Sequence, residues 1–224
     1  MKEKNIIKEF CAENFTDIPR AICAGADRIE LCDNLHRGGT TPSYGVIKQT
    51  LEYAGVHGVP VMTMIRPRGG NFVYAEDECA IMLQDIAVCK ALQSDGVVFG
   101  CLKDSWIDEA KTETLIRKAE GMNITFHMAF DELTVEGQYR AIDWLSERKV
   151  ERILTHGGLL QSPIEDNLEH LSALIAYAKG RIIMLPGGGI RHDNLHTVLG
   201  ALHVQEVHGT KIVDMANPKG LSCS

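Results

Sequence analysis

The sequence of 224 residues predicts a (β/α)8 barrel. Eight short β-rich runs occur along the chain, and amphipathic helical patterns separate most of them. Strands and helices that alternate in this way form parallel pairs with right-handed crossovers. An open, doubly wound sheet would also fit the alternation, but the count of eight strands favours the closed barrel.

The predicted strands are residues 5–11, 27–32, 59–66, 95–100, 123–130, 150–156, 181–187 and 204–209. The second strand shows how the faces are assigned, because side chains alternate along a strand. Ile29 and Leu31 share one face, and Glu30 and Cys32 share the other. The face that packs against helices must be apolar, so we expect Glu30 and Cys32 to face the barrel lumen.

The predicted helices are residues 15–25, 41–55, 75–94, 108–121, 134–148, 163–180 and 191–200. In the first of them, Ile18 and Ile22 stand four residues apart and Gly25 is placed to end the helix. Residues 210–224 show no helical pattern, so we expect a barrel that lacks a regular eighth helix in this chain. No linker interrupts the alternation, and we expect one domain over residues 1–224.

Composition and charge exclude several classes of partner. The chain is 45% apolar and 24% charged, which is ordinary for a globular protein. A net charge of −7 disfavours binding to nucleic acid or to an anionic membrane surface. No apolar run is long enough to span a bilayer, and the N-terminus does not resemble a secretory signal. Seven cysteines without a CxxC pair indicate a reduced, cytoplasmic protein.

Polar and charged side chains gather where the predicted strands end, and (β/α)8 barrels carry their chemistry at the carboxyl ends of their strands. Because an unpaired buried charge is costly, we expect a ligand or reaction site at this barrel mouth. The residues are Glu9, Cys11, Glu30, Cys32, Arg66, Arg68, His127, Asp131, His156, Glu206 and His208. The alternative is that Glu9, Glu30, Arg66 and Arg68 form a structural ion network that closes the mouth.

Two segments indicate that the mouth could hold an anion. Gly187, Gly188 and Gly189 end the seventh strand before a helix, a location that often binds phosphate in such barrels. Arg66 and Arg68 carry guanidinium groups that match carboxylate or phosphate. We expect these residues, with His208, to bind an anion. The alternatives are a tight turn for the glycines and ion pairs with loop acids for the arginines.

Cys11 and Cys32 end the first and second predicted strands, which should be neighbours about 4.8 Å apart. Two thiolates at the mouth could bind a soft ion, and Cu(I) is the ion best suited to sulfur ligands. Zinc requires four ligands, and no spaced set of Cys and His residues supplies them. The alternative is that both cysteines are small buried hydrophobes.

Several segments resemble the CutC family of copper homeostasis proteins, and the resemblance extends from Glu9 to His208. They read "GADRIELCDNLHRGGTTPSYGVI", "MIRPRGGNFVYAEDE", "DGVVFGCL", "ITFHMAFDE", "RILTHGG", "PGGGIR" and "EVHG". The resemblance implies a (β/α)8 barrel, a cytoplasmic location and a homo-oligomer, either a dimer or a tetramer. It also implies binding of Cu(I) by two cysteines, which correspond here to Cys11 and Cys32.

The sequence departs from the family pattern at three places. Met128 stands where the family usually has Arg, and strand alternation predicts that it faces away from the lumen. His156 stands where a serine is usual, and we expect it at the rim of the mouth. The segment after the eighth strand is shorter than in the family.

These observations support two functions. The first is a cytoplasmic copper homeostasis protein that binds Cu(I) at the barrel mouth. The second is an enzyme that acts on a small anionic or phosphorylated metabolite, with His127 as the acid–base group. Glu9, Glu30 and Asp131 would then be the catalytic carboxylates. A purely structural oligomer would leave the polar mouth unexplained.

Overall fold

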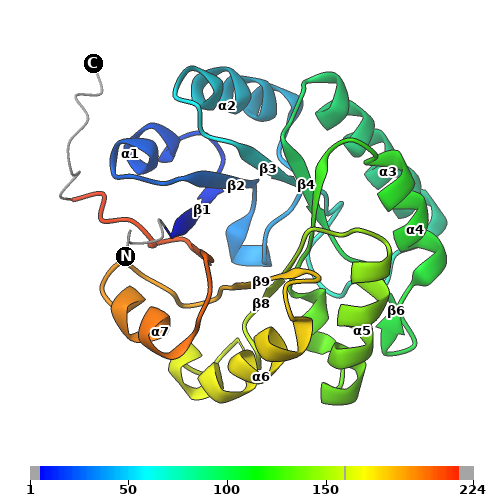
Figure 1. The fold of residues 1–224 in the computed structure, drawn as a ribbon. Helices are drawn as coiled ribbons and strands as arrows, with labels where there is room; N and C mark the ends of the chain where they lie inside the picture. Colours follow the sequence, from blue (N-terminus) through cyan, green and yellow to red (C-terminus); the bar gives the residue numbers. More distant parts are fainter. Residues whose placement is uncertain (1–5, 159, 217–224) are drawn as a thin grey trace.

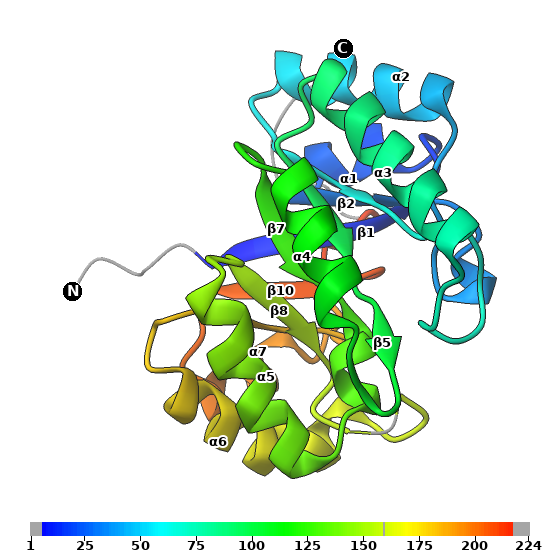
Figure 2. The same cartoon turned by 90° about the vertical axis from the view of Figure 1, so that its right-hand side faces the viewer.

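Eight parallel strands form the centre of the molecule in residues 6–158 and 160–216, which are the residues that this computed structural model describes. Their order around the barrel is β10-β1-β2-β3-β4-β7-β8-β9. Figure 1 looks down the barrel and shows the helices around the strands, and Figure 2 shows the same arrangement from the side. The predicted (β/α)8 barrel is therefore confirmed.

The barrel strands are β1 (Ile7–Glu13), β2 (Arg28–Cys32), β3 (Val61–Met64), β4 (Gly96–Phe99), β7 (Asn123–Phe126), β8 (Arg152–Thr155), β9 (Ile183–Pro186) and β10 (Glu206–Gly209). The helices are α1 (Ile18–Cys23), α2 (Tyr44–Val56), α3 (Glu76–Ala91), α4 (Glu109–Lys118), α5 (Val135–Glu147), α6 (Leu168–Ala178) and α7 (Leu195–Ala201). Short 3-10 helices are η1 (Leu35–Arg37), η2 (Met128–Glu132) and η3 (Ile164–Asn167).

The two faces of the strands pack into separate apolar clusters. Ile29 and Leu31 belong to the large cluster between the sheet and the helices. Cys32 belongs to a second cluster, in the lumen, with Cys11 and Met64. The predicted division of β2 into a helix face and a lumen face is confirmed, and it directs Glu30 and Cys32 toward the mouth.

Side-chain caps explain where several helices begin. Ser43, Asp108 and Thr134 each accept a hydrogen bond from the backbone N–H three residues later, at the starts of α2, α4 and α5. Such caps satisfy N–H groups that have no partner within the helix. The helices begin close to the positions that the sequence predicts.

Two strand ends that bear on the site differ from the sequence prediction, and one pair of strands is additional. Strand β1 continues to Glu13, so Cys11 lies within it and not at its end. Strand β7 ends at Phe126, and the chain turns into η2, where the side chain of His127 accepts a hydrogen bond from the N–H of Ala129. A small antiparallel pair, β5 (Leu102–Lys103) with β6 (Trp106–Ile107), was not predicted.

Residues 210–216 follow β10 without forming a helix, as predicted, and the rest of the predicted non-helical segment lies outside the described residues. In Figure 1 this orange-red segment passes between α7 and α1, where the outer ring of helices is open. Among the described residues, no helix combines the length and apolar character needed to cross a membrane.

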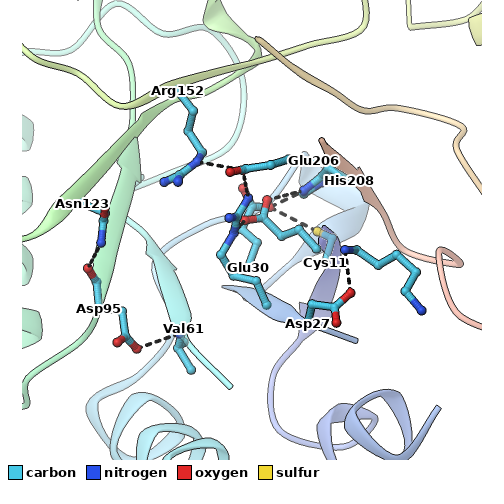
Figure 3. Close-up of polar contacts among 12 residues, drawn as sticks. Cys11, Asp27, Glu30, Val61, Asp95, Asn123, Arg152, Glu206 and His208 are labelled. Atoms are coloured by element: carbon cyan, nitrogen blue, oxygen red, sulfur yellow. Dashed lines mark hydrogen bonds and ion pairs between the residues drawn. The ribbon is translucent and has the colours of Figure 1, made fainter. Parts of the chain in front are cut away.

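A chain of buried ion pairs crosses the lumen below the mouth. The guanidinium of Arg28 contacts the carboxylates of both Glu9 and Glu206, and its Nη2 lies 2.5 Å from Glu206 Oε2. Arg152 Nε lies 3.2 Å from the same Glu206 oxygen. Figure 3 draws the contact between Arg152 and Glu206. These four side chains come from β1, β2, β8 and β10, so their ion pairs tie together strands from both ends of the sequence.

We expect Arg28→Met to destabilise the fold strongly. The replacement leaves two buried carboxylates without their shared partner, and breaking a buried pair in this way typically costs about 3–5 kcal/mol. Urea denaturation followed by circular dichroism measures the free energy of unfolding.

The matched control is Arg181→Met, because Arg181 forms an exposed ion pair with Asp143. Exposed pairs contribute little to stability, so this variant should unfold like the wild type. Equal losses in the two variants would show that burial of the Arg28 network does not matter.

Candidate functional site

Cys11, Glu30, Cys32 and His208 meet at the barrel mouth, and we call these four residues the mouth cluster. Cys11 on β1 stands opposite Glu30 on β2 in the strand register. The Sγ atoms of Cys11 and Cys32 lie 3.3 Å and 3.5 Å from Glu30 Oε2. Figure 3 shows Cys11, Glu30 and His208 converging from neighbouring strands.

His208 joins the cluster from β10, the other neighbour of β1. Its Nδ1 lies 2.8 Å from Glu9 Oε1, and its Nε2 lies 3.7 Å from Glu30 Oε2. Glu9 is in turn held by Arg28. The imidazole is therefore fixed from one side by a carboxylate and presents its second nitrogen to the mouth cluster.

The two thiols have opposite pKa shifts. A hydrogen bond from Cys32 lowers the pKa of Cys11 to about 5, and His208 contributes in the same direction against the effect of burial. The same contact with Cys11, together with burial, raises the pKa of Cys32 well above its usual value. Of the two thiols, Cys11 is therefore the one whose ionised form is favoured.

The pKa values of the neighbouring Glu30, His208 and Glu9 are shifted as well. Burial raises the pKa of Glu30 well above its usual range. Burial opposes the charged form of His208, but Glu30 and the hydrogen bonds to Cys11 and Glu9 raise its pKa well above 6.5. Burial likewise opposes ionisation of Glu9, yet the charge of Arg28 lowers its pKa to about 2. These shifts favour the charged forms of His208 and Glu9 and the neutral form of Glu30.

A cavity of about 300 Å³ opens onto the mouth cluster. His127 supplies a further polar side chain to its wall. The rest of the wall is largely apolar, and its residues are Leu35, Gly38, Met64, Phe72, Met128, Leu154, Leu160 and Thr210. The cavity could admit a small ligand to the two thiols.

His127 is buried beside this cavity. Its Nδ1 accepts a hydrogen bond from the N–H of Ala129, and its ring lies 4.7 Å from that of Phe72. Nε2 has no hydrogen-bond partner within residues 6–158 and 160–216. Burial and the charge of Arg66 lower the pKa of His127 to about 3. His127 is therefore neutral at physiological pH, with its proton on Nε2.

The two arginines of "RPRGG" hold main-chain carbonyl groups. Arg66 Nη1 donates to the carbonyls of Arg37, Gly38 and Gly39, and its Nη2 donates to that of Gly70. Arg68 donates to several carbonyls and pairs with Glu78 at 2.5 Å. These contacts join the loops after β2 and β3. The predicted alternative was ion pairs with loop acids, but Arg66 donates to carbonyls and the acid that pairs with Arg68, Glu78, lies on α3.

Asp131 lies at the end of β8, and the glycine turn begins next to His208. Asp131 accepts hydrogen bonds from the hydroxyl of Thr155 at 2.5 Å and the N–H of His156 at 2.8 Å, so it holds the end of β8. His156 is buried, not exposed at a rim.

A Cβ on Gly187 would lie 2.6 Å from Leu154 Cδ1 and 3.0 Å from His208 Cδ2, so this glycine makes room for His208.

The structure thus brings together Cys11, Cys32, Glu9, Glu30 and His208, with His127 across the cavity. The expectation that Met128 faces away from the lumen is wrong, since Met128 lines the cavity. Strand alternation does not extend to it because β7 ends at Phe126. The cavity residues Leu35, Phe72 and Leu160 come from loops and η1, where strand parity gives no direction.

Comparisons with known proteins agree on one family. The family model described as the CutC family matches residues 6–213. A CutC family protein of Enterococcus faecalis is 63% identical over 209 residues, which are 93% of this chain and 100% of that protein. The human protein named copper homeostasis protein cutC homolog is 39% identical over 206 residues, 90% of this chain and 72% of its own.

A crystal structure gives the same result. The structure of CutC from Streptococcus agalactiae matches with a TM-score of 0.90 and 44% sequence identity, and the match covers 93% of this chain and 100% of that one.

We expect the shifted pKa of His127 to make stability depend on pH. Its pKa is about 3 in the folded protein and 6.5 in an exposed histidine, so protons bind preferentially to the unfolded chain. Its contribution to stability is complete above pH 6.5 and is lost as the pH falls toward 3. Between pH 7 and pH 5, wild type should lose about 2 kcal/mol more than His127→Asn.

Urea denaturation of both proteins at the two pH values measures this difference. Asn retains an acceptor for the N–H of Ala129, and all other titrating groups are common to the two proteins. Parallel pH profiles would contradict a buried neutral His127.

Proposed function

The chain belongs to the CutC family, and on that basis we propose that it is a cytoplasmic copper homeostasis protein that binds Cu(I) through Cys11 and Cys32. The observation that carries the proposal is the closeness of the two thiols. Both are free, and their sulfur atoms lie within 4.8 Å of each other and of a Glu30 oxygen. One ion could therefore contact both.

The chemistry of the thiols supports Cu(I) as the ion. Thiolates are soft ligands, and Cu(I) is the soft ion that they select. The pKa of Cys11, lowered to about 5, favours the ionised form that binds metal. The apolar wall of the cavity limits the approach of water, and this favours sulfur ligands over hydration of the ion.

The cytoplasmic location and the homo-oligomer belong to the same proposal. A reducing compartment keeps such thiols in the form that binds metal. The oligomer would be a dimer or a tetramer, and light scattering on the eluate of a sizing column determines which.

A second candidate is an enzyme that acts on a small anionic or phosphorylated metabolite. The observation that favours it is the cavity, whose wall combines apolar side chains with His127, His208 and Glu30, all with shifted pKa values. Arg66 and Arg68 would hold the anion only by giving up bonds to main-chain carbonyls. His208 and the turn at 187–189 would remain as contacts.

We expect the reduced protein to bind one Cu(I) per chain in an anaerobic titration against a competing chelator. Replacing a residue that only hydrogen bonds to a metal ligand weakens metal binding about 10–100-fold. Replacing both ligands should therefore weaken Cu(I) binding by about 100-fold or more. Cys11→Ser/Cys32→Ser is therefore expected to lose the ion.

Two variants serve as controls. Cys79→Ser removes a buried thiol on α3, and His127→Asn changes the cavity wall without removing sulfur. Both should bind Cu(I) like the wild type. Unchanged binding in the double cysteine variant would refute the copper proposal and leave the enzyme as the candidate to screen.

A further inference from the structure

The connection between β2 and α2 closes over one of the two thiols of the mouth cluster. We call residues 33–43, which include η1, the β2–α2 loop. A Cβ on Gly39 would lie 3.3 Å from Cys32 Sγ, so the main chain of this loop packs directly against the sulfur. Leu35, from the same loop, packs on the lumen cluster that contains Cys11 and Cys32. Room beside Cys32 Sγ therefore depends on the position of the loop.

The loop leaves Cys32 as the more deeply buried of the two thiols. Cys32 is 1% exposed and Cys11 is 7% exposed, although both line the cavity. A ligand that contacts both sulfur atoms must reach Cys32 as well as Cys11. The closed position of the loop therefore limits access to the pair.

The side chain of Arg66 fastens this loop to the neighbouring one. Its Nη1 atom donates at 2.9–3.1 Å to the carbonyls of Arg37, Gly38 and Gly39, and its Nη2 atom donates at 2.6 Å to the carbonyl of Gly70, in the loop after β3. A guanidinium group presents several donors in a fixed plane, so one side chain can hold two loops at once. Hydrogen bonds from a charged donor are also stronger than those between neutral groups.

The base of the loop is held by other contacts. Asp33 and Thr40 exchange two backbone hydrogen bonds, at 3.0 and 2.7 Å. The N–H of Thr41 donates to the carbonyl of Arg66, and the N–H of Arg66 donates to the hydroxyl of Thr41. These contacts use the main chain of Arg66, so they do not depend on its side chain.

The tip of the loop, residues 34–39, depends on the side chain of Arg66. In the described part of the chain, the tip is hydrogen bonded to the rest of the barrel through the three carbonyls that Arg66 holds and through the N–H of Leu35, which lies 3.2 Å from Glu13 Oε1. Segments with few such contacts open locally at low cost in free energy. Loss of the guanidinium group should therefore free the tip and leave the base in place.

We propose that Arg66 is a positioning residue that keeps residues 34–39 closed over Cys32, so that a ligand gains access to both thiols only when this tip opens. The proposal deepens the copper function, and its consequence for metal exchange rests on that function. Opening of the tip sets the rate at which Cu(I) enters and leaves, whereas the sulfur atoms set the affinity.

The first test measures alkylation of the reduced, metal-free protein by iodoacetamide, with each cysteine followed by mass spectrometry. In Arg66→Met, Cys32 should react at least about 10-fold faster than in the wild type, because the loss of several charge-assisted hydrogen bonds raises the open fraction of the tip. Cys79, Cys89 and Cys101 are buried free thiols outside the cavity wall, and their rates should not change. Equal acceleration of all these thiols, or none at Cys32, would overturn the proposal.

Arg68→Met is the matched control. Arg68 donates to carbonyls of its own loop, at residues 69, 71 and 73, and pairs with Glu78 on α3. It therefore resembles Arg66 in its contacts but does not hold the β2–α2 loop, and Cys32 should react at the wild-type rate. Acceleration as large as in Arg66→Met would show that Arg66 has no particular role in closing the tip.

Two further variants make the test independent of how well Arg66→Met folds. Arg66→Lys retains the charge, but a compact ammonium group cannot span both loops, so Cys32 should react at an intermediate rate. Gly39→Ala adds a Cβ that must move away from Cys32 Sγ, at a φ of 83° that alanine rarely adopts, and it should also accelerate the reaction. Wild-type rates at Cys32 in both variants would contradict closure by Arg66.

The second test times the transfer of Cu(I) from the loaded protein to an excess of a chelator by stopped flow. Arg66→Met should release Cu(I) at least about 10-fold faster than the wild type, with a Kd within about threefold, because opening accelerates entry and exit alike. Unchanged release, or a loss of affinity that accounts for the faster release, would show that Arg66 does not control access. If neither protein binds Cu(I), the copper function is wrong, and the alkylation rates alone decide whether Arg66 closes the loop.

Discussion

The arrangement of the charged side chains in the barrel lumen depends on the contacts that hold the carboxylate of Glu9. It contacts Arg28 on one side and His208 on the other, and Arg28 continues through Glu206 to Arg152. A charge removed from water must be paired, and each of these groups is paired by the next. The same row of ion pairs joins strands from both ends of the chain and sets the orientation of the one imidazole in the mouth cluster. Stability and site geometry therefore rest on the same contacts.

Much of the fold follows from the sequence because its signals are local. Alternation along β2 assigned Ile29 and Leu31 to the helices and Glu30 to the lumen, and the structure agrees. The alternation of side chains between the two faces does not predict the direction of Met128, because η2 begins where the strand was expected to continue. Hydrogen bonds from the N–H groups of Ala129 and Phe130 to His127 accompany this change of direction, and the pattern of apolar residues does not reveal them.

The site was predictable in its location but not in its partners. The strand-end rule placed Cys11 and Cys32 at the mouth, although it could not show that a carboxyl group lies between them. Arg66 was expected to bind an anion because guanidinium groups match carboxylate and phosphate, yet its Nη1 and Nη2 atoms donate to carbonyls of two loops. Ligand sets are recognised in sequences by short spacing, and His208 is brought to Cys11 only by closure of the barrel.

The pairing of β1 with β2 places Cys11 opposite Glu30. Successive residues of a strand point to opposite faces, so a shift by one residue turns the whole lumen set toward the helices. An insertion or deletion inside β1 would thus turn Glu9 and Cys11 away from the lumen, and one inside β2 would turn Glu30 and Cys32 away together. An insertion or deletion in a loop would leave the directions of these side chains unchanged. Evolution can therefore change the chemistry of this mouth by substituting residues, but it cannot change the lengths of β1 and β2 without losing the site.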